Sequence, residues 1–174
     1  MKKMLMTTAL LLTAVMGLQA QSLFGTWETE KEIDEEAGTQ ITCYLTINEG
    51  GTGEFFGKGM ASVPNAADIS FSISFPLTYT RDGNVLNITS EPSKAVAKLD
   101  KIEYKGDAIQ VVKENPEIKE EFEKQLKELI EDNLAKEYIN EPPFDGEITI
   151  IKITDTTLVL NDGDEDNIEL KRVK

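Results

Sequence analysis

The sequence contains no histidine, one cysteine and only two arginines among its 174 residues. The lack of histidine excludes Ser-His-Asp and Cys-His catalysis and removes the commonest zinc ligand. The single cysteine, Cys43, cannot form an internal disulfide and has no imidazole base to make it a nucleophile. We therefore expect no enzyme, no catalytic residue and no cofactor. The alternative is a carboxylate-based enzyme, but no motif places two carboxylates in a fixed apolar setting.

Positive charge is also scarce, because 18 Lys and Arg residues stand against 32 Asp and Glu residues and give a net charge of −14. Such a charge repels phosphate backbones and anionic lipid surfaces, so neither nucleic acid nor a membrane surface is an expected partner. A large net charge of one sign favours a soluble monomer.

Long apolar runs are absent except at the start of the chain. Lys2 and Lys3 precede an uncharged, mostly apolar run over residues 4–18, and Ala20 is a small residue before Gln21. This pattern is typical of a secretory signal peptide, whereas a membrane span needs about 20 apolar residues. The sequence predicts a leader at 1–20 and one exported domain at 21–174, periplasmic or secreted. Because no cysteine stands at the predicted cleavage point, we expect no lipid anchor.

The exported part alternates apolar and polar residues, which predicts a mainly β domain. The clearest strand has one apolar and one small or polar face, as in antiparallel sheets, although Pro76 marks an edge or a break in it. The adjacent Ile150 and Ile151 interrupt the alternation and predict a β-bulge. The expected strands are residues 24–33, 41–47, 52–58, 69–80, 85–89, 95–104, 108–112, 147–154, 157–160 and 167–173, with a loop at 61–67.

One amphipathic helix is expected over residues 116–139. Asn115 suits the N-cap position and Pro116 the first helical position. Apolar residues at helical spacing form a stripe, which we interpret as packing against the sheet. A lid over an open barrel end and a docking surface for a partner protein are the alternatives. The stripe comprises Ile118, Phe122, Leu126, Leu129, Ile130, Leu134 and Tyr138.

Two segments resemble the lipocalin-like β-barrels, especially the small exported ones of bacteria. Leu23-Phe24-Gly25-Thr26-Trp27 is similar to the Gly-x-Trp that opens the first lipocalin strand, and residues 153–160 and 168–172 are similar to the closing hairpin. The resemblance implies an antiparallel barrel of about eight to ten strands, with Arg172 lying across Trp27 to close one end. The alternative is that Trp27 is an ordinary core aromatic and Arg172 a solvated residue.

A barrel of about eight strands can hold one small ligand. The inward-facing apolar positions are then the candidate cavity lining, unless they fill a solid core. These candidates are Ile41, Cys43, Leu45, Phe71, Ile73, Phe75, Leu86 and Ile88.

Three alternating acids, Asp162, Asp164 and Asp166, are a candidate calcium site, because Ca²⁺ takes hard oxygen ligands at such spacing. The segment does not fit an EF-hand, since its twelfth position is Val173 instead of a Glu. An acidic hairpin turn at the surface is the alternative, and we expect no metal.

The expected function is that of an exported, non-enzymatic protein that binds a small apolar or amphipathic molecule in a barrel cavity. The alternative is an envelope or secreted interaction module, similar to an inhibitor, with a filled core and another protein as its partner. An exposed apolar stripe on the helix would favour the second function.

Overall fold

The computed structural model describes residues 22–30, 32–34, 38–134, 136, 140, 142–163 and 166–173. The predicted leader lies outside these ranges, as do Tyr138 and Asp164. Within the described ranges the chain is mainly β, as predicted. The strands are β1 (Gly25–Thr29), β2 (Glu32–Asp34), β3 (Thr39–Ile47), β4 (Thr52–Val63), β5 (Ala67–Asp82), β6 (Val85–Ser90), β7 (Val96–Tyr104), β8 (Gly146–Ile153), β9 (Thr157–Asn161) and β10 (Ile168–Arg172), with a 3-10 turn η1 (Pro92–Lys94) before β7.

Eight of the strands close into an antiparallel barrel, which confirms the predicted fold class. The order around the barrel is β1-β10-β9-β8-β6-β5-β4-β3, and β1 completes the ring by pairing with both β10 and β3. β2 pairs with β3 and β7 pairs with β5, outside the ring. Closure gives each barrel strand two neighbours and removes edges that could pair with other chains.

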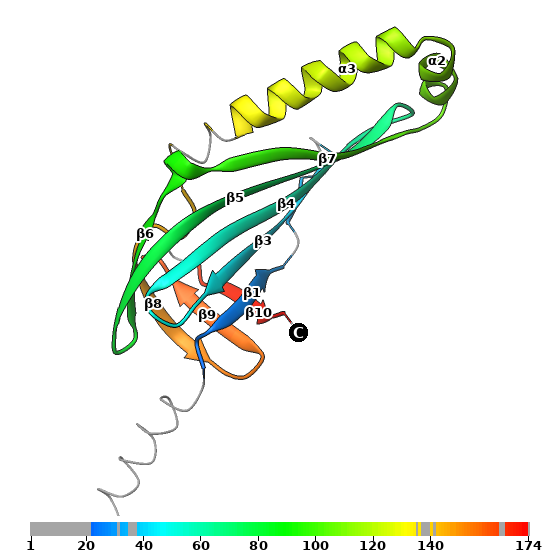
Figure 1. The fold of residues 1–174 in the computed structure, drawn as a ribbon. Helices are drawn as coiled ribbons and strands as arrows, with labels where there is room; N and C mark the ends of the chain where they lie inside the picture. The colour runs from blue at the N-terminus through cyan, green and yellow to red at the C-terminus, as the bar shows by residue number, and fades with distance from the viewer. Residues whose placement is uncertain are drawn as a thin grey trace, which may run out of the picture.

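Part of the sheet continues beyond the barrel as an arm (Figure 1). The arm consists of β7 and the residues level with it, 39–44 of β3, 56–63 of β4 and 67–74 of β5. The other part of β5, residues 77–82, pairs with β6 in the barrel. Pro76 lies between the two parts, so the predicted break falls where β5 exchanges one neighbour for the other, and the missing N–H is tolerated there.

The loop predicted at 61–67 is wrong, because the two long strands of the arm continue through most of it. β4 runs to Val63 and β5 starts at Ala67, and these two residues pair across the turn. Asn65 adopts a left-handed conformation, with φ of 58°, which Asn tolerates better than most residues. A three-residue turn therefore suffices where a loop of seven residues was predicted.

The strand predicted at 108–112 is also wrong, because this segment is the helix α2 (Ala108–Glu114). Its short apolar run is compatible with either element, and periodicity alone does not separate the two. The backbone turns at Gly106, whose φ of 54° favours glycine, and the segment makes local hydrogen bonds such as Val111 N–H to the Asp107 carbonyl (3.2 Å).

The predicted helix at 116–139 is found as α3 (Pro116–Leu129), followed by a π-helical turn η2 (Ile130–Leu134). Pro116 takes the first helical position, as predicted. Asn115 is at the N-cap, but its side-chain amide donates to the Val111 carbonyl of α2 (3.0 Å) instead of accepting from the first turn of α3. Figure 1 shows α3 running beside the arm from its outer end toward the barrel, and η2 contacts β7.

In the described part of the sheet, two β-bulges shift the register between paired strands. The pairing of β8 with β9 shifts between Ile150 and Lys152, which confirms the predicted bulge and turns Ile151 outward. A second bulge in β7, between Leu99 and Lys101, was not expected. There the buried Ser72 hydroxyl donates to the Asp100 carboxylate (3.0 Å), so the extra residue gains a partner across the ladder.

Candidate functional site

The predicted cavity-lining residues divide between the barrel core and the outer part of the arm. Leu45, Ile73, Phe75, Leu86 and Ile88 are buried in the barrel core, and Cys43 packs against that core. Ile41 and Phe71 are only half-buried and lie on the arm, where both pair with Gly59. The structure therefore brings five of these residues together in the barrel core, with Cys43 against it, and leaves two outside it.

Side chains occupy the described barrel interior. The Phe55 and Phe75 rings stack at 4.7 Å between centroids, beside the fully buried Trp27 and Leu45. Gly53 lies opposite Leu77, where a Cβ would come within 2.3 Å of the Thr46 carbonyl and 2.7 Å of the Leu77 side chain. Small residues on β4 thus make room for large ones on β5, which favours a filled core.

Arg172 and Trp27 lie together at one end of the barrel. They pair directly between β10 and β1, and the guanidinium carbon lies 4.0 Å from the centroid of the Trp27 ring. The guanidinium donates to the carbonyls of Asp155 (2.8 Å), Phe24 (2.7 Å) and Ser22, while the indole N–H donates to the Leu23 carbonyl (2.9 Å). One cation therefore joins the N-terminal segment to the turn between β8 and β9 across the buried ring.

The position two residues before Trp27 requires a glycine, Gly25. Its φ is 131°, and a Cβ there would lie 2.6 Å from Nη1 of Arg172. Any side chain at this position would be strained and would obstruct the guanidinium. The Gly-x-Trp pattern is thus a requirement of the closing contact.

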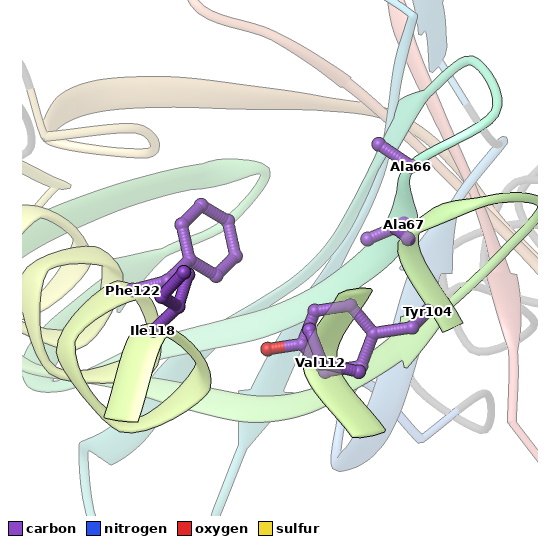
Figure 2. Close-up of a pocket in the computed structure, with 7 residues that line it drawn as sticks. Ala66, Ala67, Tyr104, Val112, Ile118 and Phe122 are labelled. Carbon is purple, nitrogen blue, oxygen red and sulfur yellow. The ribbon is translucent and has the colours of Figure 1, made fainter. Parts of the chain in front are cut away.

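An apolar hollow of about 200 Å³ lies outside the barrel, between the two helices and the outer end of the arm (Figure 2). Figure 2 shows Ile118 and Phe122 of α3 on one side of the hollow, and Tyr104 and Val112 on another. The Phe122 and Tyr104 rings are 6.4 Å apart between centroids. The lining residues are Ala66, Ala67, Tyr104, Ala108, Val112, Ile118 and Phe122, and the Tyr104 hydroxyl is their one polar side-chain group.

The apolar stripe of α3 is largely exposed to solvent. Ile118 is 55% exposed and Phe122 41%, while Leu126 is half-buried. A second hollow of about 360 Å³ lies beside the same two residues and is also lined by Glu117, Glu121 and Gln125. We call the two hollows and the Ile118–Phe122 ridge between them the groove.

The groove continues the inner face of the barrel. Ala67, Ile69, Phe71, Ile73 and Phe75 alternate along β5, whose pairing with β4 is unbroken from one end to the other. These residues therefore share one face of the strand. Inside the barrel this face is covered, whereas at its outer end Ala67 borders the groove.

Polar contacts at the rim hold the helices beside the arm. The Tyr104 hydroxyl donates to the Glu123 carboxylate of α3 (3.2 Å). Burial, together with the neighbouring Glu123 carboxylate, raises the pKa of Tyr104 to about 12. This phenol is therefore a neutral donor at physiological pH.

The start of α2 is tied to the hairpin of the arm. The Lys105 N–H donates to the Ala66 carbonyl (2.7 Å), and the Lys105 side chain pairs with Asp68. Hydrogen bonds from Lys105 and Ser62 lower the pKa of Asp68. These contacts fix the outer end of the groove.

Sequence reasoning identified Ile118 and Phe122 as part of a stripe but missed Ala66, Ala67 and Tyr104. Ala108 and Val112 were assigned to a strand, although their i,i+4 spacing is also that of one helix face. The groove depends on where α2 and α3 return relative to the arm, and no local pattern carries that information.

The candidate calcium site is only partly described. Asp162 and Asp166 flank the turn between β9 and β10, but Asp164 lies outside the described residues, so the calcium candidate stays a prediction. In the part of the chain that the structure describes, no three His, Cys, Asp or Glu side chains gather closely enough to hold a metal ion.

Comparison with known proteins yields no family. No family model matches the chain, and no curated protein matches it. In the described ranges, no helix has the length and apolar character needed to cross a membrane.

Proposed function

We propose that this protein is an exported, non-enzymatic interaction module that binds a partner protein through the groove. One observation carries the proposal: Ile118 and Phe122, a large aliphatic and an aromatic side chain, are 55% and 41% exposed beside an apolar hollow. Exposed apolar surface rimmed by polar residues is typical of interaction sites. The barrel serves as a rigid scaffold that carries the arm.

The exposure of the groove favours a partner protein over an enclosed small ligand. Pockets for small molecules measure about 300–1,000 Å³ and bury most of the ligand. The two hollows, of about 200 and 360 Å³, instead border a solvent-exposed ridge, so each suits one anchoring side chain of a larger partner. Docking of an amphipathic helix into an apolar groove is also a recurring mode of peptide recognition.

The sequence favoured a small ligand inside the barrel, with the interaction module as the alternative. The stacked Phe55 and Phe75 and the fully buried Trp27 occupy the described interior and weigh against it. Lipocalin-like identity, export and a monomeric state remain part of the proposal, supported by the closed barrel, the Trp27–Arg172 contact and the N-terminal composition.

Site-specific photocrosslinking in the source cells tests the proposal. A photoreactive residue at position 118 should give one discrete adduct, and the same residue at position 151 should give none. Ile151 is the matched control, because it is also 55% exposed but lies on the barrel. Phe122→Asp should abolish the adduct and weaken binding of the purified partner by about tenfold or more, as loss of an anchor does.

Equal adducts from both positions, or none from position 118, would contradict the proposal. Native mass spectrometry of the purified protein separates the two functions. A small molecule that co-purifies and survives Phe122→Asp would favour the barrel ligand instead.

A further inference from the structure

We infer that the groove binds a basic amphipathic segment of its partner, with apolar side chains in the hollows and lysines or arginines against Glu117 and Glu121. The inference rests on the proposed function and adds the chemistry of the partner. It follows from the two hollows, which meet at Ile118 and Phe122 but differ in character.

The first hollow is apolar and the second has an acidic wall. Glu117 and Glu121 are four residues apart, on one side of α3, and both line the second hollow with Gln125. The Gln125 amide donates to Glu121 (2.7 Å). Among the described residues, neither carboxylate forms an ion pair with a lysine or arginine, so both are available to a cation from outside.

A helical segment can present the side chains that such a groove would bind. Anchors at i and i+3 or i+4 on one face of a helix can enter two neighbouring hollows, and the polar residues beside them then face the rim. With an acidic rim, basic residues there gain attraction, while acidic ones are repelled. Two features of the groove therefore select the partner, the apolar ridge for affinity and the acidic wall for specificity.

Charge also disfavours the other occupants. A second copy of this chain carries the same net charge of −14 and the same acidic wall, so its approach is repelled. Anionic lipid surfaces are repelled for the same reason. A basic segment is the occupant that both the local and the overall charge attract.

The test uses two synthetic amphipathic peptides with identical leucine faces, one with lysines and one with glutamates on the polar face. Their binding to the purified protein is followed by fluorescence anisotropy at low and high salt. We expect the lysine peptide to bind more tightly, and its advantage to shrink as salt screens the rim charges.

Two double variants with the same net charge separate the acidic wall from general attraction. Glu117→Gln/Glu121→Gln should weaken binding of the lysine peptide by roughly threefold to tenfold, since two exposed ion pairs with modest individual contributions are lost. Glu120→Gln/Glu147→Gln removes two exposed carboxylates that line neither hollow and should change the affinity by less than about twofold. Circular dichroism checks that both variants fold.

Each other outcome overturns a stated part of the account. Equal binding of both peptides, weakened in each case by Phe122→Ala, would overturn the basic partner but leave the docking function intact. Equal losses in the two double variants would mean general attraction to an acidic protein and would overturn the acidic wall. No binding of either peptide, or self-association of the protein through the ridge, would overturn the docking function as well.

Discussion

Removal of the Arg172 guanidinium tests the closure of the barrel. Arg172 joins three backbone carbonyls, from Ser22, Phe24 and Asp155, and covers the Trp27 ring at 4.0 Å. In Arg172→Ala water can hydrogen-bond to the three carbonyls. The loss of each protein hydrogen bond should therefore lower the stability by only about 0.5–1 kcal/mol, the low end of the usual range. Loss of the cation–π contact adds about 0.5–1 kcal/mol. We expect a loss of about 3 kcal/mol in the free energy of unfolding.

Two variants calibrate this figure. Arg172→Lys keeps a cation near the ring but cannot reach all three carbonyls, so it should retain about half of the lost stability. Arg81→Ala removes the other arginine of the chain, which is exposed and donates to the Gly83 carbonyl (2.8 Å). It should cost less than about 1 kcal/mol.

Urea unfolding followed by Trp27 fluorescence measures the change, and thermal unfolding checks it. For a domain of about 150 residues, 3 kcal/mol corresponds to a fall in Tm of roughly 10 °C. If Arg172→Ala destabilises the protein no more than Arg81→Ala, the contact does not hold the barrel end closed and the reasoning is refuted.

Two further predictions concern the packing of the barrel interior and the hydrogen bond at the rim of the groove. Gly53→Ala should lower the free energy of unfolding, measured in urea, by about 2–3 kcal/mol, because its Cβ would lie 2.3 Å from the Thr46 carbonyl. Gly57→Ala should cost less, because the nearest neighbour of its Cβ would be a side-chain methyl group at 3.1 Å. Equal costs of the two variants would contradict the packing argument. The pKa of Tyr104 is raised to about 12, against about 10 in the unfolded chain, so its contribution to stability should be intact below pH 10 and lost as the pH rises toward 12. Glu123→Gln should lower the pKa of Tyr104, as read from a phenolate titration corrected with Tyr104→Phe, and an unchanged pKa would rule out the role of the carboxylate.

The parts of the fold that local patterns determine could be predicted. Alternation at 69–80 placed β5 and the face it buries, and the adjacent Ile150 and Ile151 located a bulge. In each case the period of the side chains fixes which face is apolar, and burial of that face fixes the pairing. The expected contact between Arg172 and Trp27 is also present, and it depends on an arginine, a tryptophan and a glycine at these positions.

The arm and the groove could not be predicted, because they depend on contacts between distant segments. Nothing local to residues 61–67 indicates that β4 and β5 continue beyond the barrel to a tight turn. The short apolar run at 108–112 fits a strand or a helix, and in the structure it forms the helix α2 beyond the end of the arm. The amphipathic stripe identified Ile118 and Phe122, but only the tertiary arrangement shows that both are left exposed.

Methyl NMR of the protein during titration with the lysine peptide tests the central claim most directly, because it locates the bound segment. Binding in the groove should shift the methyl signals of Ala66, Val112 and Ile118, which line it, with little change at Leu86 in the barrel core. Shifts centred on Leu86 and Ile88, with Ile118 unaffected, would place the ligand inside the barrel and contradict the account.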